Sequence, residues 1–340
     1  MGYPELFGKD LITTQDWTRE ELDIVLDLAK VYKQKYYTGN VPEALKNKTF
    51  FMLFYNTSTR TRASFEAAMT ALGGHAQYID SATTRGGEGE IPRDMAKMYE
   101  RYGHGLGIRI LESAVNYEYG RGAQIIRECA KHATVPVISM ADDKDHPTQG
   151  LTDMMTIQEK FPKYEKKKYV IMWGYSTKIR SWAGVQCDML IASRYGVDIT
   201  LCYPPGFDVD QEVVDQTKIN AEDSGGDFEI SHNYKEALEG AHMVFPRNWA
   251  SHQCYSVGLN KFGKENEVAL HNKFKEWTLT QELVDQMDKN SKIMHVLPVF
   301  RGEEATDEVM DGPHSAVYDQ AENNLYTRMA VLALTMGGKW

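Results

Sequence analysis

Residues 49–66, with the sequence TFFMLFYNTSTRTRASFE, predict a buried strand, a polar turn and the start of a helix. The apolar run Phe50–Tyr55 has the length and aromatic content of a buried strand. Asn56–Thr59 are turn and N-cap residues. An apolar face at helical spacing follows: Phe65, Met69 and Leu72. The stretch therefore places a helix N-terminus directly after the end of a strand.

The turn carries groups that suit a phosphate. A helix N-terminus offers unpaired N–H groups and a partial positive charge. Hydroxyls of Ser58, Thr59 and Thr61 and the guanidinium of Arg60 are added to it, and arginine presents paired donors to phosphate oxygens. The alternative is an ordinary capped helix with exposed arginines. The composition of the stretch leaves both interpretations open.

Length and composition predict a globular protein of two domains. The chain has 340 residues, 42% of them hydrophobic, and a formal charge of −10, which argues against general binding of nucleic acid or a membrane surface. Its four cysteines show no C-x-x-C spacing and are typical of reduced thiols in a cytoplasmic protein. The N-terminus lacks the apolar core of a signal peptide, and no apolar run is long enough to span a bilayer.

Strand and helix patterns alternate along both halves of the chain. This predicts an α/β fold of two doubly wound parallel-sheet domains joined by helices. We expect a first domain over residues 1–150, closed by a C-terminal helix over 320–340, and a second over 151–319. The polar segment 251–276 shows no clear period and is expected to be a long loop, which in a compact chain is functional or topologically unusual.

Several polar groups follow the predicted strands of the first half. Parallel sheets bind ligands at the carboxyl ends of their strands. Asn56–Arg60, Arg109 and the segment after Met140 all fall at that edge, which argues for one site. The chain has further arginines at predicted strand ends or turns, chief among them Arg180, Arg247 and Arg301.

Other chemistries have weaker support. His146 and His295 are each explained as well by a structural role as by a catalytic one. No His, Cys or Asp cluster has metal-ligand spacing, so no metal or other cofactor is expected. The sequence also lacks G-x-S-x-G, a Walker-type loop and G-x-G-x-x-G, which argues against a serine nucleophile and a nucleotide site.

Four motifs in order resemble the aspartate and ornithine carbamoyltransferases, over nearly the whole chain: Ser58-Thr-Arg-Thr-Arg62, Arg109, His146-Pro-Thr-Gln149 and His295-Val-Leu-Pro298. The resemblance implies two α/β domains with an active site between them, shared across the interfaces of a homotrimer. It also implies carbamoyl phosphate and a small amine as substrates.

The resemblance further implies roles for these residues. Ser58, Thr59, Arg60 and Thr61 would hold the phosphate, and Arg109 would bridge the phosphate and the carbonyl oxygen. His146 would polarise the carbonyl, and Gln149 and the Leu297 carbonyl would orient the carbamoyl amine, with Leu297-Pro298 a cis peptide. Arg60, Arg109 and His146 are thus the expected catalytic residues, and they act by positioning and electrostatics.

The acceptor site is expected to contain Arg180, Arg247 and Arg301, which suit an acceptor with at least one carboxylate. Arg180 and the stretch Gln320–Ala330 resemble aspartate enzymes, so an aspartate-like acceptor is the first expectation. Ornithine or an N-acylornithine is the alternative.

Four stretches resemble the knotted transcarbamylases, which include the acylornithine enzymes: Trp173-Gly-Tyr-Ser, Ser224-Gly-Gly-Asp-Phe, Arg247-Asn-Trp-Ala and Ala305–Asp311. A knot in the second domain is therefore expected.

The chain also departs from its relatives' patterns. Val299 stands where aspartate enzymes have an arginine, Glu304 where acetylornithine enzymes have a modified lysine, and Asn324 where they have an arginine. Glu88 takes the place of the lysine that aspartate enzymes send into the neighbouring subunit's site, where Arg85 or Arg93 would substitute. Glu88 and Val299 motivate a second hypothesis, a non-catalytic relative that binds carbamoyl phosphate or a similar anion without turnover.

Overall fold

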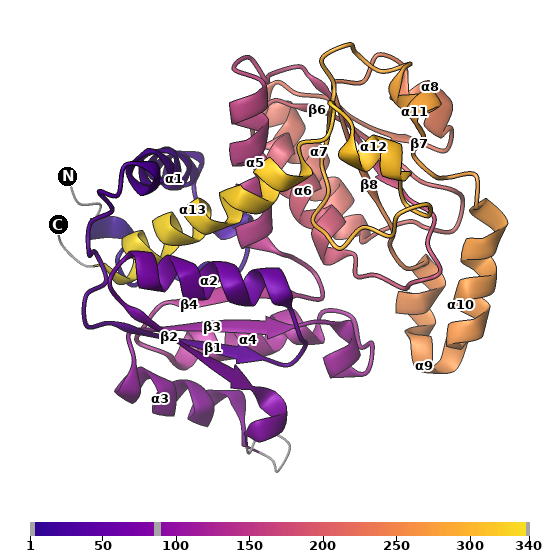
Figure 1. The fold of residues 1–340 in the computed structure, drawn as a ribbon. Coiled ribbons are helices and arrows are strands. Elements are labelled where there is room, and N and C mark those ends of the chain that lie inside the picture. Colours follow the sequence, from indigo (N-terminus) through magenta and orange to yellow (C-terminus); the bar gives the residue numbers. More distant parts are fainter. Residues whose placement is uncertain (1–3, 85–89, 338–340) are drawn as a thin grey trace. The chain divides into compact units, whose positions relative to one another are not determined.

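The computed structural model describes residues 4–84 and 90–337, which fall into two compact units (Figure 1). Unit 1 is drawn from residues 1–115, 119–155 and 322–340, and unit 2 from residues 116–118 and 156–321. The chain passes between the units within α5 (Pro147–Lys160) and again within α13 (Val317–Met336). Among the described residues, no helix is both long and apolar enough to cross a membrane.

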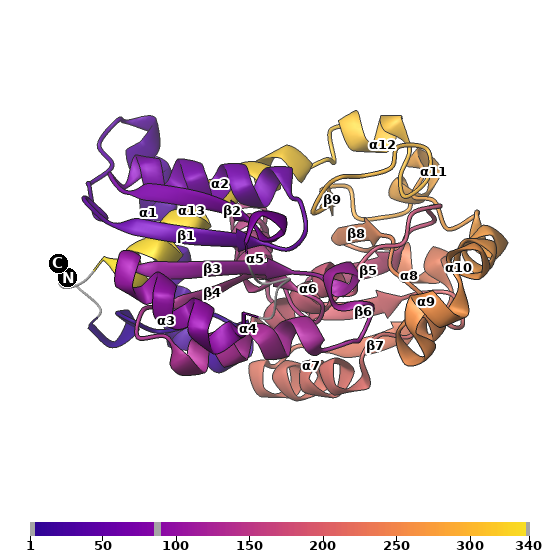
Figure 2. The same ribbon diagram turned by 90° about the horizontal axis from the view of Figure 1, so that it is seen from below.

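Unit 1 contains a parallel sheet of four strands in the order β2-β1-β3-β4. Its strands and main helices are α1 (Arg19–Tyr37), β1 (Thr49–Phe54), α2 (Thr59–Ala71), β2 (His75–Asp80), α3 (Pro92–Tyr102), β3 (Gly105–Ile110), α4 (Arg121–His132) and β4 (Val137–Asp142). Helices α1, α2 and α13 cover one face and α3 and α4 the other (Figures 1 and 2).

Local sequence explains the helix boundaries of unit 1. Thr18 and Glu21 form a capping box at the start of α1, and Pro92 occupies the first position of α3, where its missing N–H costs nothing. Phe50 of β1 stacks on Phe65 of α2 with ring centroids 5.5 Å apart. The apolar positions predicted for the opening stretch are thus the ones that join strand and helix.

Unit 2 contains a parallel sheet of five strands in the order β7-β6-β5-β8-β9. Its elements are β5 (Lys168–Trp173), α6 (Ala183–Ser193), β6 (Asp198–Cys202), α7 (Gln211–Ser224), β7 (Phe228–Ser231), α8 (Tyr234–Leu238), β8 (Met243–Arg247), α9 (Leu259–Phe262), α10 (Lys264–His271), α11 (Gln281–Val284), β9 (Lys292–Ile293) and α12 (Asp307–Asp311). The prediction of two parallel-sheet α/β units is confirmed.

The prediction of a long loop over 251–276 is wrong, because α9 and α10 lie there. Two buried positions of α10 are the polar residues Glu267 and His271, so the segment has no apolar stripe to detect. Glu267 accepts hydrogen bonds from the amide (2.6 Å) and the hydroxyl (2.5 Å) of Ser251. His271 Nε2 lies 3.0 Å from Glu267 Oε1, and its Nδ1 lies 2.8 Å from the Ser176 carbonyl. Polar pairing thus helps to hold α10 in place, while Cys254 and Leu259 earlier in the segment are buried apolar residues.

Two elements of unit 2 are short. Strand β9 covers only Lys292 and Ile293. Helix α11 is a single turn over Gln281–Val284. His295 follows β9 and is fully buried.

Candidate active site

The start of α2 presents the predicted phosphate turn at the carboxyl edge of the unit 1 sheet. Ser58 is the N-cap, and its hydroxyl accepts a hydrogen bond of 3.3 Å from the amide of Thr61. Thr59 and Arg60 are the first two helical residues, whose amides have no partner within the helix. With no acidic residue in this first turn, the partial positive charge of the helix end is uncompensated there.

Asn56 joins this turn to the end of β3. Its Oδ1 accepts from the Leu111 amide at 2.7 Å, and its Nδ2 donates to the Ser113 hydroxyl at 2.8 Å. The strand order reverses between β1 and β3, and ligands of doubly wound sheets bind at such a point. The structure therefore brings Arg109, near the end of β3, to the edge where α2 begins.

Arg109 is a desolvated cation. Its Nη1 donates to the Met140 carbonyl at 3.4 Å, while its buried Nε has no hydrogen-bond partner among the described residues. Burial lowers the pKa of Arg109 to about 10; Glu112 opposes this shift, and the nearby charge of Arg60 adds to it. The guanidinium remains charged at neutral pH and is poorly compensated, so it suits an anionic ligand.

His146 lies between β4 and α5 and is only 8% exposed. Its carbonyl accepts from the amides of Gln149 and Gly150 in the first turn of α5, which fixes its backbone. Burial lowers the pKa of His146 well below the ordinary value, and the charges of Arg109 and Arg328 lower it further. The imidazole is therefore neutral at physiological pH and can donate one N–H hydrogen bond.

Gln149 lies in the first turn of α5 and is buried. Its Nε2 donates to Asp153 Oδ1 at 2.6 Å, which orients the side-chain amide.

Arg328 of α13 is a site residue that the sequence analysis missed. It is 1% exposed, and its Nη1 donates to the Thr152 hydroxyl at 3.0 Å and the Asn324 carbonyl at 3.1 Å. Its buried Nε has no hydrogen-bond partner among the described residues, and burial lowers its pKa to about 9, with Asp153 opposing. The available signal was an arginine within an otherwise apolar helical stretch, residues 326–336.

The unit 2 sheet has its own reversal of strand order, between β5 and β8. The segment after β5 carries Arg180, and β8 ends at Arg247. The Arg180 guanidinium lies over the Phe300 ring, with Cζ 4.7 Å from the centroid, and its buried Nε has no hydrogen-bond partner within the described ranges. Arg180 is thus held by an aromatic face while a buried donor still needs an acceptor.

Arg247 belongs to a buried cluster with Glu304 and His295. Its Nη1 lies 3.6 Å from Glu304 Oε1 and donates to the Pro298 carbonyl at 3.3 Å. His295 Nδ1 accepts from the Leu297 amide at 2.8 Å, so its proton is assigned to Nε2, which lies 3.4 Å from the same Glu304 oxygen.

Glu304 is a fully buried carboxylate that several donors keep ionised. It accepts from the amides of Asn248 and Phe300, both at 2.8 Å. Although burial opposes ionisation, His295, Arg247 and these bonds lower its pKa to about 2. A Cβ at Gly174 would lie 3.2 Å from the Glu304 Cβ, so a larger residue there would push against Glu304. Glu304 therefore compensates Arg247 internally.

Arg301 differs from the other two arginines of this unit. Its Nη1 donates to Asp307 at 2.7 Å and to Asp311 at 2.6 Å, and its Nη2 donates to Asp311 at 2.7 Å. These exposed ion pairs occupy the guanidinium. Arg301 therefore belongs to a surface cluster with α12, and we leave it out of the acceptor site proposed below.

Leu297 precedes Pro298 through a cis peptide bond, as expected. Its φ of 56° is in the left-handed region, which a leucine rarely adopts. Arg85 and Glu88 lie outside the described residues, and the neighbouring-subunit role predicted for Arg85 stays a prediction.

Two family models match the chain. "Aspartate/ornithine carbamoyltransferase, carbamoyl-P binding domain" matches residues 9–159, and "Aspartate/ornithine carbamoyltransferase, Asp/Orn binding domain" matches residues 180–335. Together they cover nearly all of the chain.

Individual relatives agree with the family models. The chain is 36% identical to the anabolic ornithine carbamoyltransferase of Pyrococcus furiosus, over 98% of each chain. It is 32% identical to the N-acetylornithine carbamoyltransferase of Xanthomonas campestris, over 97% of this chain and 98% of the relative. A solved structure of an N-acetyl-L-ornithine transcarbamylase variant, complexed with carbamyl phosphate and N-succinyl-L-norvaline, matches with a TM-score of 0.87 and 30% identity, over 96% and 99% of the two chains.

Proposed function

The chain belongs to the aspartate/ornithine carbamoyltransferase family, and we propose that it transfers the carbamoyl group of carbamoyl phosphate to the terminal amine of an N-acylated ornithine. The observation that carries the donor half of this proposal is a pair of buried arginines beside a neutral histidine. Arg109 and Arg328 each keep a buried Nε donor without a hydrogen-bond partner among the described residues, and both lower the pKa of His146. Fixed cations next to a neutral N–H donor suit a phosphate dianion joined to a polar carbonyl group.

In the proposed reaction, the start of α2 holds the phosphate through Ser58, Thr59, Arg60 and Thr61. Arg109 spans the phosphate and the carbonyl oxygen, and neutral His146 donates an N–H to that oxygen. The acceptor amine attacks the carbonyl carbon, the carbon–oxygen bond to phosphate breaks, and the phosphate leaves with the bonding electron pair. The proton lost by the amine passes to the departing phosphate. Positioning and fixed charge supply the rate enhancement.

The carbamoyl amine is proposed to be oriented by Gln149 and by the backbone carbonyl of Leu297. Gln149 is suited to this because Asp153 fixes its amide, and Leu297 because the His295 ring holds its backbone.

Arg180 is proposed to bind the carboxylate of the acceptor. Its guanidinium makes no ion pair among the described residues, whereas Arg247 is compensated by Glu304 and Arg301 by two aspartates. Arg247 is therefore assigned to positioning the Leu297-Pro298 backbone through its bond to the Pro298 carbonyl.

The relatives favour an ornithine-type acceptor over the aspartate-like acceptor that was expected first. Within that type, the N-acyl form fits this chain better. A free α-ammonium group needs a carboxylate partner, and the two glutamates that follow Phe300, the ring under Arg180, are engaged. Glu303 accepts from Ser176 and Thr177, and Glu304 from the two backbone amides described above. Free ornithine is the second candidate, because the 36% identical relative is named for it.

The experiment is a panel of acceptors with carbamoyl phosphate: N-acetylornithine, N-succinylornithine, ornithine and aspartate. Phosphate release above the blank without amine is measured, and the carbamoylated product is identified by mass spectrometry. We expect an N-acylornithine to give a kcat/KM at least ten times that of ornithine, and aspartate to give none. A preference for ornithine would select the second candidate. If none of the four amines causes phosphate release above the blank, the non-catalytic hypothesis is favoured.

A homotrimer with shared sites and a cytoplasmic location remain proposals drawn from the family resemblance. Mixed reassociation tests the shared site. Arg60→Met and Arg85→Met subunits should each be inactive alone and should regain activity after joint reassociation, since hybrid trimers contain sites with both arginines. No recovery from folded hybrid trimers would argue against a role for Arg85 in a neighbouring site.

A further inference from the structure

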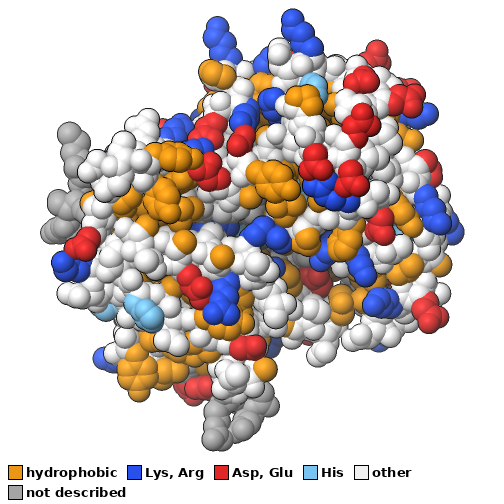
Figure 3. All heavy atoms as spheres, viewed as in Figure 1, with side chains coloured by type: hydrophobic (Ala, Val, Ile, Leu, Met, Phe, Trp, Pro, Cys, Tyr) orange, Lys and Arg blue, Asp and Glu red, His pale blue; other side chains and the backbone are white. Residues whose placement is uncertain are grey.

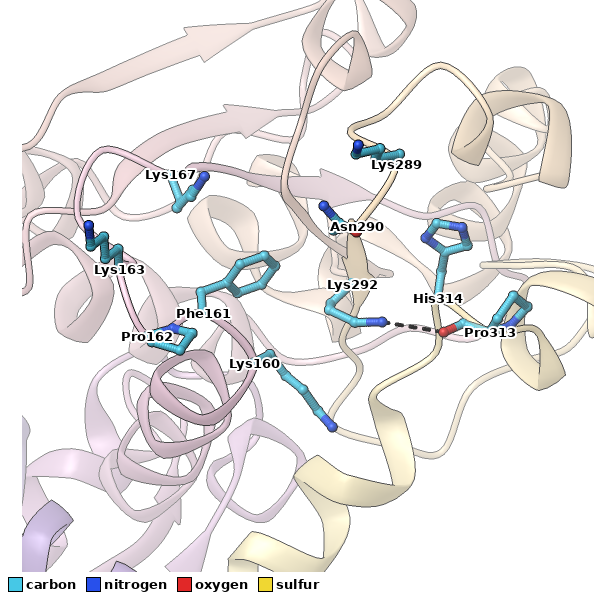
Figure 4. Close-up of a pocket in the computed structure, with 10 residues that line it drawn as sticks. All are labelled: Lys160, Phe161, Pro162, Lys163, Lys167, Lys289, Asn290, Lys292, Pro313 and His314. Carbon is cyan, nitrogen blue, oxygen red and sulfur yellow. Dashed lines mark hydrogen bonds between the residues drawn. The ribbon is translucent and has the colours of Figure 1, made fainter.

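A basic cleft lies in unit 2, away from the arginines discussed above. It has a volume of about 830 Å³ and is lined by Lys160, Phe161, Pro162, Lys163, Lys167, Lys289, Asn290, Lys292, Pro313 and His314 (Figure 4). The lining comes from the end of α5, the connector to β5, the loop before β9 and the turn before α13. In Figure 4, Phe161 lies between Lys163 and Lys167 on one side and Asn290 and Lys292 on the other. We call this the lysine cleft.

The lysine cleft concentrates positive charge in an acidic protein. Five of its ten lining residues are lysines and none is Asp or Glu, although the whole chain carries −10. Lys163, Lys167 and Lys289 make no side-chain hydrogen bond or ion pair within the described parts of the chain. On the face shown in Figure 3, basic and acidic side chains are interspersed over much of the surface. Like charges gathered without partners repel one another, and an anion relieves that repulsion.

The remaining polar groups of the lysine cleft are held in place. Lys160 pairs with Asp319, and Lys292 Nζ donates to the Pro313 carbonyl at 3.3 Å. His314 Nδ1 lies 2.9 Å from the Ser291 carbonyl, to which it can donate. These contacts fix part of the walls, while the three lysines that make no ion pair within the described residues supply positive charge.

We propose that the lysine cleft binds a small organic polyphosphate, of which a nucleoside triphosphate is the model. The volume is within the range of sites for small organic ligands and is far larger than one phosphate needs. Phe161, Pro162 and Pro313 provide apolar surface for an organic group. A long polyanion such as nucleic acid is disfavoured, because the net charge of the protein opposes its approach.

This site is distinct from the proposed acceptor site within the same unit. Lys167 precedes β5 and Lys292 begins β9, so the lysine cleft lies at the amino edge of the sheet. Arg180 and Arg247 belong to the opposite, carboxyl edge. The chain leads from the lysine cleft toward the buried Glu304 cluster within a few residues, because Lys292 lines the cleft and His295 follows three residues later.

Calorimetric titration with ATP, tripolyphosphate and citrate tests the site. The wild-type protein and an Arg60→Met variant are both used, the latter to remove binding at the proposed carbamoyl phosphate site. We expect both ATP and tripolyphosphate to bind the Arg60→Met protein at about 50 mM salt, with ATP binding more tightly. Both affinities should fall as the salt concentration rises. Adding K163Q, K167Q and K289Q should weaken both at least tenfold.

The matched control carries K218Q, K261Q and K264Q, three exposed lysines outside the lysine cleft, and changes net charge equally. It should bind within twofold of its parent, and all variants should melt within a few degrees of it. Equal losses in both triple variants, or no binding of either polyphosphate, would overturn the site. If ATP binds no more tightly than tripolyphosphate, the proposal that the cleft recognises an organic group is overturned. If citrate binds most tightly, the proposal that the ligand is a polyphosphate is overturned.

Discussion

The carboxyl edges of the two sheets treat their arginines differently. At the unit 1 edge, Arg109 and Arg328 are buried and keep donors without hydrogen-bond partners in the described structure. At the unit 2 edge, Arg247 faces Glu304 and Arg301 faces two aspartates, whereas Arg180 makes no ion pair within the described residues. The first edge therefore suits an anionic ligand, in line with the proposed function. At the second edge, carboxylates of the protein already pair with most of the arginines.

The buried carboxyl groups of the two units show the same contrast. Burial and the charges of Asp145 and Asp143 raise the pKa of Asp142 in unit 1 to about 7. Glu304 in unit 2 is as deeply buried, yet its pKa falls to about 2 because His295 and Arg247 face it. Neighbouring charge, rather than burial alone, decides the ionisation of these groups.

The largest expected effect is at the carboxyl edge of the unit 1 sheet, which we call the donor edge because carbamoyl phosphate is proposed to bind there. Arg60→Met should lower kcat/KM for carbamoyl phosphate by about 1,000-fold or more, because the phosphate loses a charged donor in a water-poor site. Arg62→Met is the matched control from the same motif. Arg62 is exposed, donates to Glu66 at 2.9 Å and stacks on Tyr78. Because exposed ion pairs contribute little, Arg62→Met should lower kcat/KM for carbamoyl phosphate less than about threefold. Steady-state phosphate release measures both, and similar losses would show that the site is misplaced.

The next largest effect is on the stability of unit 2. Glu304→Gln should lower the free energy of unfolding by about 3 kcal/mol, because it leaves buried Arg247 without its counter-charge. Since the pKa of Glu304 is depressed, its contribution is present above about pH 4.5 and is lost as pH falls toward 2. Glu303→Gln is the partly exposed control, for which about 1 kcal/mol is expected. Denaturant unfolding at pH 7 compares them, and equal losses would contradict the buried ion cluster.

At the carboxyl edge of the unit 2 sheet, which we call the acceptor edge, replacing Arg180 should weaken acceptor binding and replacing Arg301 should not. Arg180→Met should raise the KM for the acceptor about 30-fold while leaving the KM for carbamoyl phosphate within about threefold, as expected for lost carboxylate binding. Arg301→Met should change both KM values less than about twofold, since exposed ion pairs contribute little. If Arg301→Met has the larger effect on acceptor KM, the assignment of the two arginines must be exchanged.

The smallest expected effect concerns Asp142. Its pKa is raised in the folded protein, so folding binds protons between about pH 4 and 7, and this group disfavours the folded state as pH rises through that range. Asp142→Asn should therefore unfold like the wild type at pH 4 and be more stable by about 1–3 kcal/mol at pH 8. Asparagine can keep the bonds from Lys144 and Asp145 and donate to Ser139. Chemical unfolding across this pH range measures it, and a less stable variant at pH 8 would refute the shift.

Much of the donor edge could be predicted because its signals are local. Strand β1, the Ser58 cap and the start of α2 lie within a short stretch, and the parallel alternation brings Arg109 and His146 to the same edge. The acceptor edge could not be predicted as well. The partners of Arg301 and Arg247 come from other segments, and nothing in the local pattern shows that a carboxylate has already engaged them.

The sequence by itself determined the two parallel-sheet units and the phosphate turn, because hydrophobic period, capping residues and strand-to-helix order act over a few residues. Only the tertiary structure decided which charges remain for ligands. It brought Arg328 of α13 into unit 1 beside Arg109, buried Glu304 against Arg247, and formed the lysine cleft from segments far apart in the chain. Desolvation and charge pairing depend on what packs around a group, and that is a property of the folded chain.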